Sequence, residues 1–185
     1  MPRSKKTTKK QHVAFWKIYL VIALLLIGGG LLIQLVFVAQ PSFTQAPPRT
    51  THYAKNVPLT KIIIPSISVS LHLESALVTD GRWYVSPDQG TFLGNGSYPT
   101  EKGSIIVYGH NKEKIFGPLR NIKKDATITL INADKKVYSY KLYSIQVVSP
   151  YQIDVLEEEK ETLIIFTCTG FADSKRLVIK ASPIK

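Results

Sequence analysis

The one cysteine of the chain, Cys168, lies where it could act as a nucleophile. It follows the apolar run Leu163–Phe166, which is typical of a strand buried on both faces. The thiol therefore comes at the exit of a core strand, where a side chain can reach a cleft. A lone cysteine can also be a small, inert core residue. A reactive thiol needs a base or a cation beside it, because the thiolate is the form that attacks.

Two further residues could supply that base and that cation. His110 ends a second core run, Ile105–Val107, and Arg176 follows Cys168 by eight residues. If residues 169–174 form the loop of an antiparallel hairpin, Arg176 lies almost opposite Cys168. A partly buried guanidinium requires an anion or a carbonyl group to bond. The three residues together predict a thiol nucleophile, an acid–base group and a cation that stabilises an oxyanion.

The elements that must position these residues are short strands separated by turn residues. We predict strands at Lys61–Ile64, Val69–Leu73, Arg82–Val85, Gly103–Gly109, Thr127–Ile131, Lys136–Ile145, Thr162–Cys168 and Lys175–Ala181. A short helix or turn is expected at Ile115–Ile122, where Phe116, Leu119 and Ile122 recur every third residue. Roughly eight strands in this length predict an all-β, closed or nearly closed barrel.

Four segments of the chain resemble those of one family. They are Ser104-Ile105-Ile106-Val107-Tyr108-Gly109-His110, Phe116-Gly117-Pro118-Leu119, Phe166-Thr167-Cys168-Thr169 and Lys175-Arg176-Leu177-Val178. In this order and spacing they resemble a sortase over residues 60–182. The resemblance implies that His110, Cys168 and Arg176 are the catalytic residues. It also implies that Thr167 shapes the substrate groove, and we expect Thr169 to contribute to substrate binding.

The family resemblance implies cysteine transpeptidation. The enzyme would cleave a C-terminal sorting motif resembling Leu-Pro-x-Thr-Gly in surface proteins, through a thioester on Cys168. It would pass the acyl group to an amine of a peptidoglycan precursor or a pilin Lys. The subclass and the exact motif stay open, because Ile164, Ile165 and Gly170 depart from the common pattern.

The N-terminal part of the chain has the pattern of a membrane anchor. Ile18 to Ala39 contains 22 residues without a charge, and six of the 24 basic residues precede Ile18. This length matches the hydrocarbon core of a bilayer, and the basic flank indicates a cytoplasmic N-terminus. A cleaved signal peptide fits less well, because its apolar region is shorter and Phe37 is too bulky for the cleavage site.

The domain organisation follows from these patterns. We predict a cytoplasmic basic flank at residues 1–17, a transmembrane signal-anchor at 18–39 and a Pro-rich tether at 40–58. A sortase-like catalytic β-barrel fills residues 59–185, outside a single-pass cell-membrane anchor. The remaining 18 basic residues face 13 acidic ones, so the overall charge of +11 does not indicate a nucleic-acid-binding face.

No metal or cofactor is expected, although the family resemblance leaves a calcium site near the loop before the cysteine strand as the alternative. The acidic residues Glu157, Glu158, Glu159 and Glu161 are interpreted as a solvated turn, because consecutive side chains point apart whereas calcium needs converging oxygens. Two other function classes remain open beside the sortase hypothesis. An L,D-transpeptidase would carry an arginine two residues after its cysteine, where this chain has Gly170. A membrane-tethered, non-catalytic β-domain that binds a surface partner would have a buried and unreactive Cys168.

Overall fold

The computed structural model describes residues 19–27, 57–79 and 81–184. Residues 19–27 are helical and exposed, and they belong to a different unit of the chain from the remainder. In these described ranges no helix has both the length and the apolar content needed to cross a membrane. The predicted flank at 1–17, most of the predicted anchor at 18–39 and nearly all of the predicted tether at 40–58 lie outside the described residues.

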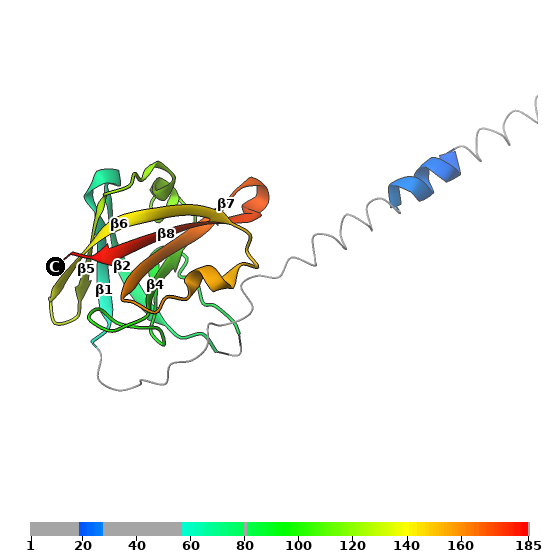
Figure 1. The fold of residues 1–185 in the computed structure, drawn as a ribbon. Coiled ribbons are helices and arrows are strands. Elements are labelled where there is room, and N and C mark those ends of the chain that lie inside the picture. The colour runs from blue at the N-terminus through cyan, green and yellow to red at the C-terminus, as the bar shows by residue number, and fades with distance from the viewer. Residues whose placement is uncertain (1–18, 28–56, 80, 185) are drawn as a thin grey trace, which may run out of the picture. The chain divides into compact units, whose positions relative to one another are not determined.

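The second unit is an eight-stranded closed barrel, as the turn-separated short strands predicted. Around the barrel the strands follow the order β1-β2-β3-β4-β7-β8-β6-β5 (Figure 1). Their bounds are β1 Leu59–Ile64, β2 Val69–Ala76, β3 Gly90–Leu93, β4 Ser104–Gly109, β5 Thr127–Asn132, β6 Val137–Val148, β7 Thr162–Thr169 and β8 Lys175–Pro183. The pairs β2–β3 and β4–β7 are parallel, whereas the other neighbours are antiparallel.

The strands β4 and β7 are buried on both faces, which explains why their sequences do not alternate. One face fills the barrel with Ile105, Val107, Leu163 and Ile165. The opposite face belongs to a second apolar cluster outside the barrel, with Ile106, Tyr108, Ile164 and Phe166. This outer cluster is covered by Trp83 and Val85 and by the short helix η3, Ile153–Leu156. The outer face of β4 and β7 is thus a covered surface on which a site can be built.

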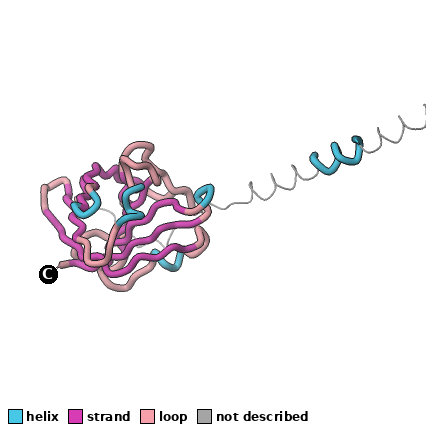
Figure 2. The backbone as a smooth tube through the Cα atoms, turned by 90° about the horizontal axis from the view of Figure 1, so that it is seen from above, coloured by secondary structure: helices cyan, strands magenta, loops and turns pink. Residues whose placement is uncertain are grey.

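Within residues 57–79 and 81–184, helical structure is limited to short 3-10 turns between strands (Figure 2). They are η1 Pro65–Ile67, η2 Gly117–Asn121, η3 and η4 Phe171–Asp173. The predicted helix or turn at 115–122 is confirmed as η2 and its flanks. Its apolar residues Phe116, Leu119 and Ile122 are all buried, and their spacing of three matches the three residues per turn of a 3-10 helix.

One predicted strand is wrong and one strand was missed. Residues 82–85 alternate in burial like a strand, but among the described residues their only strand-type pairing is the Thr79–Arg82 bridge. Their pattern arises because Trp83 and Val85 pack onto the outer cluster. The missed strand is β3, whose four residues are all buried. Gly90 begins it and lies close to Leu73, which would have to shift for a side chain at this position, because a Cβ there would lie 2.7 Å from Leu73 Cδ2.

Candidate active site

The three residues predicted to do chemistry line one cavity. Cys168 is the ladder partner of Arg176 between β7 and β8, and Gly109 is the partner of Thr167 between β4 and β7. His110 follows Gly109 directly, so it lies at the end of β4 next to the thiol-bearing end of β7. A cavity of about 220 Å³ is lined by His110, Cys168 and Arg176. We call it the catalytic cavity, because the three residues predicted to do chemistry line it.

The topology explains why these side chains meet. Because β4 and β7 are parallel neighbours, their carboxyl ends lie at the same edge of the sheet. The tight β7–β8 hairpin then returns Arg176 to that edge. Side chains alternate between the two faces of a strand, so Cys168 shares the outer face with Ile164 and Phe166. The thiol therefore faces away from the barrel interior.

The hairpin loop between Cys168 and Arg176 has an unusual backbone. Gly170, Ala172 and Asp173 have positive φ angles of 80°, 48° and 58°. Residues other than glycine lose about 1 kcal/mol or more in this region, so the loop requires contacts that hold it. Arg176 provides them, because its Nη1 donates hydrogen bonds to the Asp173 carbonyl at 2.7 Å and to the Lys175 carbonyl at 2.9 Å. The sequence predicted that a partly buried Arg176 bonds an anion or a carbonyl group, and these two carbonyls are such partners. The two hydrogen bonds also hold the guanidinium of Arg176, which lines the cavity.

The electrostatic setting of Cys168 favours the neutral thiol at rest. Burial is the largest influence and raises the pKa of the Cys168 thiol. The positive charge of Arg176 lowers this pKa, and the negative charge of Asp173 raises it. The net direction is upward. A reaction through the thiolate therefore starts from the less populated form of Cys168. The positive charge of Arg176 increases the population of that form, because it lowers the thiol pKa.

The two threonines predicted to bind substrate have different places. Thr167 is buried and lines the catalytic cavity, but its hydroxyl donates to the Gly109 carbonyl at 2.8 Å. That bond ties β7 to β4 one residue before His110 and one before Cys168. Thr169 is half-buried and pairs with Lys175, and it is not among the residues that line the cavity. A substrate contact of either side chain stays a prediction.

An aromatic wall of the cavity escaped the sequence analysis as a group. Tyr108 and Phe166 stack with ring centroids 5.2 Å apart, and Trp83 meets Tyr108 edge-on at 5.1 Å. All three line the catalytic cavity beside Cys168. Tyr108 and Phe166 could have been found by counting back two residues from His110 and Cys168, since alternate residues share a face.

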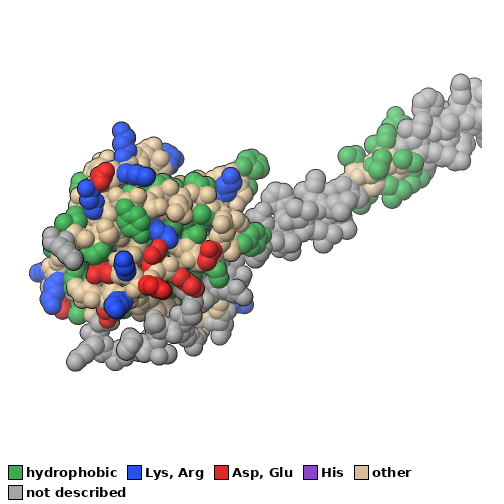
Figure 3. Space-filling model, viewed as in Figure 1, with side chains coloured by type: hydrophobic (Ala, Val, Ile, Leu, Met, Phe, Trp, Pro, Cys, Tyr) green, Lys and Arg blue, Asp and Glu red, His purple; other side chains and the backbone are tan. Residues whose placement is uncertain are grey.

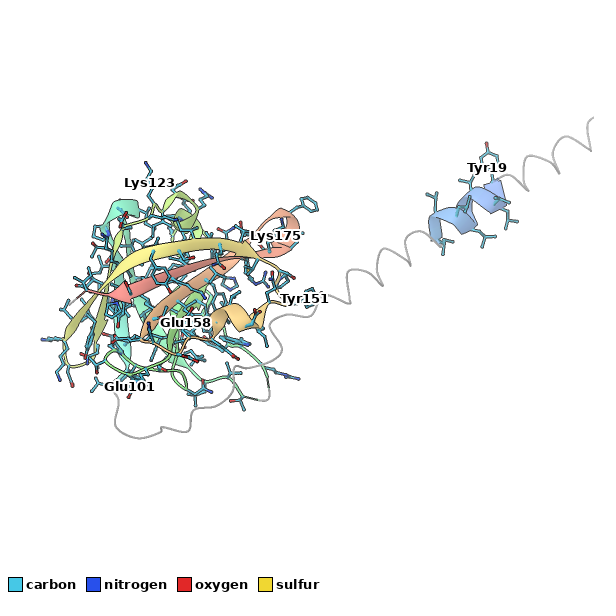
Figure 4. All side chains as sticks on the ribbon, in the orientation of Figure 1. Tyr19, Glu101, Lys123, Tyr151, Glu158 and Lys175 are labelled. Carbon is cyan, nitrogen blue, oxygen red and sulfur yellow. The ribbon has the colours of Figure 1, made fainter. Side chains whose placement is uncertain are left out.

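The acidic turn before β7 is not simply solvated. Glu158 pairs with Lys180 at 2.7 Å, and their side chains are only 28% and 12% exposed. Glu161 accepts hydrogen bonds from the Tyr140 hydroxyl at 2.8 Å and the Thr100 backbone N–H at 3.1 Å. Figure 4 labels Glu158 apart from Lys175, which begins β8 next to Arg176. In the ranges that the structure covers, no three His, Cys, Asp or Glu side chains are grouped so that they could hold a metal ion.

Comparisons with known proteins agree on one family. A family model described as "Sortase domain" matches residues 62–184. "Putative sortase YwpE" of Bacillus subtilis (strain 168) is 36% identical over 92 residues, which are 48% of this chain and 83% of that protein. Sortase A of Streptococcus agalactiae serotype III (strain NEM316) is 25% identical over 128 residues, 65% of this chain and 50% of that protein.

The solved structures that resemble the barrel have the same fold. Sortase C1 from Streptococcus agalactiae has a TM-score of 0.60 and 22% identity, over 68% of this chain and 67% of that one. A lid mutant of sortase A from Corynebacterium diphtheriae has a TM-score of 0.59 and 22% identity, over 71% and 73% of the two chains.

Proposed function

This chain belongs to the sortase family, and on that premise we propose that it is a cysteine transpeptidase acting through Cys168. It cleaves a C-terminal sorting motif resembling Leu-Pro-x-Thr-Gly in surface proteins and transfers the acyl group to an amine. The acceptor is an amino group of a peptidoglycan precursor or a pilin Lys. The observation that carries the proposal is that His110, Cys168 and Arg176 line one cavity of a sortase barrel.

In the first half of the reaction the Cys168 thiolate attacks the carbonyl carbon of the scissile peptide bond. The carbonyl oxygen becomes an oxyanion, and the guanidinium of Arg176 stabilises its charge. His110 in its protonated form donates a proton to the leaving nitrogen, and the C–N bond breaks. The products are a thioester on Cys168 and the released C-terminal part of the substrate.

In the second half the acceptor amine attacks the thioester carbonyl. His110, now neutral, takes the proton that the amine loses, and Arg176 again stabilises the oxyanion. The C–S bond breaks, a new amide forms and Cys168 leaves as the thiolate. The chain therefore needs Cys168 deprotonated and His110 protonated at the start of each cycle. Because burial raises the pKa of the thiol, only a fraction of the enzyme has Cys168 deprotonated and His110 protonated at the same time.

We propose that the barrel works on the outer face of a cell membrane, held by a single span with its N-terminus in the cytoplasm. The uncharged segment Ile18 to Ala39 and its basic flank support this proposal. Cysteine labelling of intact cells with a membrane-impermeant maleimide tests it, since Cys168 is the only thiol. Labelling that requires permeabilised cells would contradict an external barrel.

A non-catalytic, membrane-tethered binding domain is the second candidate. It is favoured by the half-buried state of Cys168 and by the upward shift of its pKa, because both make a thiol less reactive. The two candidates differ in whether Cys168 becomes acylated.

The experiment that tests the proposal uses the full chain in detergent micelles with a quenched Leu-Pro-x-Thr-Gly peptide and an amine acceptor. We expect a Cys168-linked acyl-enzyme and a ligated product by mass spectrometry, both absent in Cys168→Ala. If that peptide gives no adduct, a library of sorting motifs follows. A library without any adduct, together with an unreactive thiol, would favour the binding domain.

A further inference from the structure

Three loops leave the barrel at the edge where the catalytic cavity lies. The strands β4, β7, β8 and β6 are consecutive neighbours, and β4, β7 and β6 all end at this edge. The loop after β4 begins at His110, the β7–β8 loop covers residues 170–174, and the loop after β6 begins at Ser149. A partner that approaches Cys168 from this end of the barrel therefore meets these three loops first.

Each of the three loops presents exposed side chains. The β7–β8 loop carries Phe171, which is 89% exposed, and the loop after β6 carries Tyr151, which is 58% exposed. Lys112 and Lys114 are exposed in the loop after β4, and Lys175 is exposed at the start of β8. Figure 4 labels Tyr151 and Lys175 on the same side of the barrel. We call these five residues the catalytic rim.

The β7–β8 loop displays Phe171 on a fixed backbone. The Ser174 N–H donates to the Phe171 carbonyl at 3.1 Å, and Arg176 holds the Asp173 carbonyl at 2.7 Å. The exposure of the ring thus belongs to a hydrogen-bonded turn and not to a loose chain end. An apolar ring gains free energy when it leaves water. Phe171 is therefore available to a partner that removes it from water.

The charges of the barrel differ between the two ends of β7. Residues 153–161, before its start, carry five acidic residues and one lysine, which are Asp154, Glu157, Glu158, Glu159, Glu161 and Lys160. At its other end the rim contributes three lysines, and of the acidic residues in its loops Glu113 already pairs with Arg120 at 2.9 Å. Figure 3 shows acidic side chains gathered on the face that carries Glu158, whereas the upper side, with the tip of the β7–β8 loop, shows mainly basic and hydrophobic ones. An anionic surface therefore attracts the rim and repels the start of β7.

The occupant that fits the rim is a lipid bilayer with anionic head groups. Lysine side chains are attracted to such head groups, tyrosine rings favour the interface, and phenylalanine rings enter the boundary of the acyl chains. A protein partner would instead require a continuous apolar core. Phe171 and Tyr151 stand on separate loops with charged residues between them, which suits a soft surface that each ring can enter alone.

The sequence also brings a bilayer within reach of the rim. The predicted tether at residues 40–58 spans at most about 65 Å when fully extended. A domain of this length has a radius of gyration of about 14 Å, so such a tether permits any side of the barrel to face the membrane. The anchor would also hold the barrel at a high local concentration, so weak contacts are sufficient for docking. The side that docks is then selected by its charges and its exposed rings.

We propose that the catalytic rim docks onto an anionic lipid surface, with Phe171 inserted among the lipids and Lys114 and Lys175 against the head groups. The inference rests on the proposed membrane attachment and adds an orientation to it. The end of the barrel that carries His110 and Cys168 faces the bilayer. A substrate or an acceptor that is itself held in the membrane then meets the catalytic cavity at the level of the head groups.

The test uses the full chain, as Cys168→Ala with one new cysteine that carries an NBD fluorophore, reconstituted in vesicles that contain nitroxide-labelled lipid. The label is placed at Phe171→Cys or, as a control, at Val137→Cys, which is 62% exposed and begins β6 at the opposite end of the barrel. In vesicles of equal parts phosphatidylcholine and phosphatidylglycerol, we expect a blue-shifted and quenched label at position 171 and neither effect at position 137. Vesicles of phosphatidylcholine alone should weaken the docking equilibrium at position 171 by about tenfold or more.

Two pairs of substitutions test which lysines act, each with the label at position 171. Lys114→Gln/Lys175→Gln should weaken docking by about tenfold to thirtyfold, because each lysine near an anionic surface contributes about fivefold. The matched control is Lys135→Gln/Lys136→Gln, which removes two exposed lysines from the β5–β6 hairpin. It should stay within about twofold of the parent chain, because charges far from the surface are screened.

Equal quenching at positions 171 and 137 would overturn the docking, and so would equal quenching at position 171 with and without phosphatidylglycerol. An equal loss in the two lysine variants would overturn it as well. These measurements use an inactive chain, so their failure leaves the transpeptidase proposal intact, and a failure of Cys168 acylation leaves the docking intact. A chain that does not float with the vesicles would overturn the membrane attachment and the docking together.

Discussion

Cys168 and Arg176 are direct ladder partners across the β7–β8 hairpin, and the guanidinium that lowers the pKa of the thiol also holds the loop between them. One side chain thus influences both the electrostatics of the Cys168 thiol and the shape of the strained backbone that follows it. Substitutions at Arg176 should therefore affect more than the stabilisation of an oxyanion.

Replacing Arg176 by alanine should reduce acyl-enzyme formation by about 10²- to 10³-fold, the usual loss for one oxyanion-stabilising donor. Arg176→Lys should recover only part of this, because an ammonium lacks the planar fork that bonds the Asp173 and Lys175 carbonyls. Single-turnover mass spectrometry of the Cys168 thioester measures both. Lys175→Ala, at the neighbouring exposed cation, should stay within about twofold of wild type. Wild-type-like turnover by Arg176→Ala would contradict the proposed role.

The rate of Cys168 alkylation should rise with pH, with a midpoint above that of an exposed cysteine, because burial raises the thiol pKa. Arg176→Gln should move the midpoint further up, since the lost charge had lowered this pKa. Asp173→Asn should move it down, since the lost carboxylate had raised it. Iodoacetamide kinetics between pH 6 and about pH 11 measure all three. A wild-type midpoint below that of a free cysteine, or shifts of opposite sign, would show that the local charges act differently.

Thr167→Val should lower the free energy of unfolding by about 1–2 kcal/mol, because it leaves the Gly109 carbonyl without its side-chain donor. Since Gly109 precedes His110, we expect kcat to fall while KM changes little. Thr167→Ser keeps the hydroxyl and should restore kcat. Denaturant unfolding and steady-state kinetics give the two readouts. A large rise in KM with unchanged kcat would instead assign Thr167 to substrate binding.

Breaking the Lys180–Glu158 ion pair should loosen the turn before β7. Lys180→Met and Glu158→Gln should each destabilise the barrel by about 1–2 kcal/mol, because the pair is largely buried. The charge-swapped double variant should recover part of that loss. The exposed Lys141–Asp125 pair is a matched control and should show almost no coupling in a double-mutant cycle. Equal coupling energies for the two pairs would contradict a special role for Lys180.

The sequence patterns that predicted local structure correctly share one property. Each can be interpreted without knowing which distant segment packs against it. The uninterrupted apolar runs of β4 and β7 required burial on both faces, and the spacing of Phe116, Leu119 and Ile122 required a turn of three residues. The interval between Cys168 and Arg176 is likewise a property of one hairpin. The approach of His110 was suggested by its position at a strand end, but it depends on β4 and β7 being neighbours.

Whether a short segment forms a strand depended on the segments that pack against it, and only the tertiary structure decided this. Residues 82–85 alternate like a strand, yet their burial comes from packing Trp83 and Val85 onto the outer cluster, without a hydrogen-bonded ladder. The segment β3 has only four residues, which is too few to show the alternation typical of a strand. Its pairing with β2 and β4 makes it a strand.

The sequence by itself predicted the class of chemistry, and it determined the all-β barrel and the chain order of His110, Cys168 and Arg176. The tertiary structure decided the surroundings of the predicted site: the aromatic wall beside Cys168 and the ion pair of Glu158 with Lys180. The physical reason is that residue type and period encode which side chains must be buried. The partner that buries them, or pairs with their charge, comes from segments far along the chain that only folding brings together.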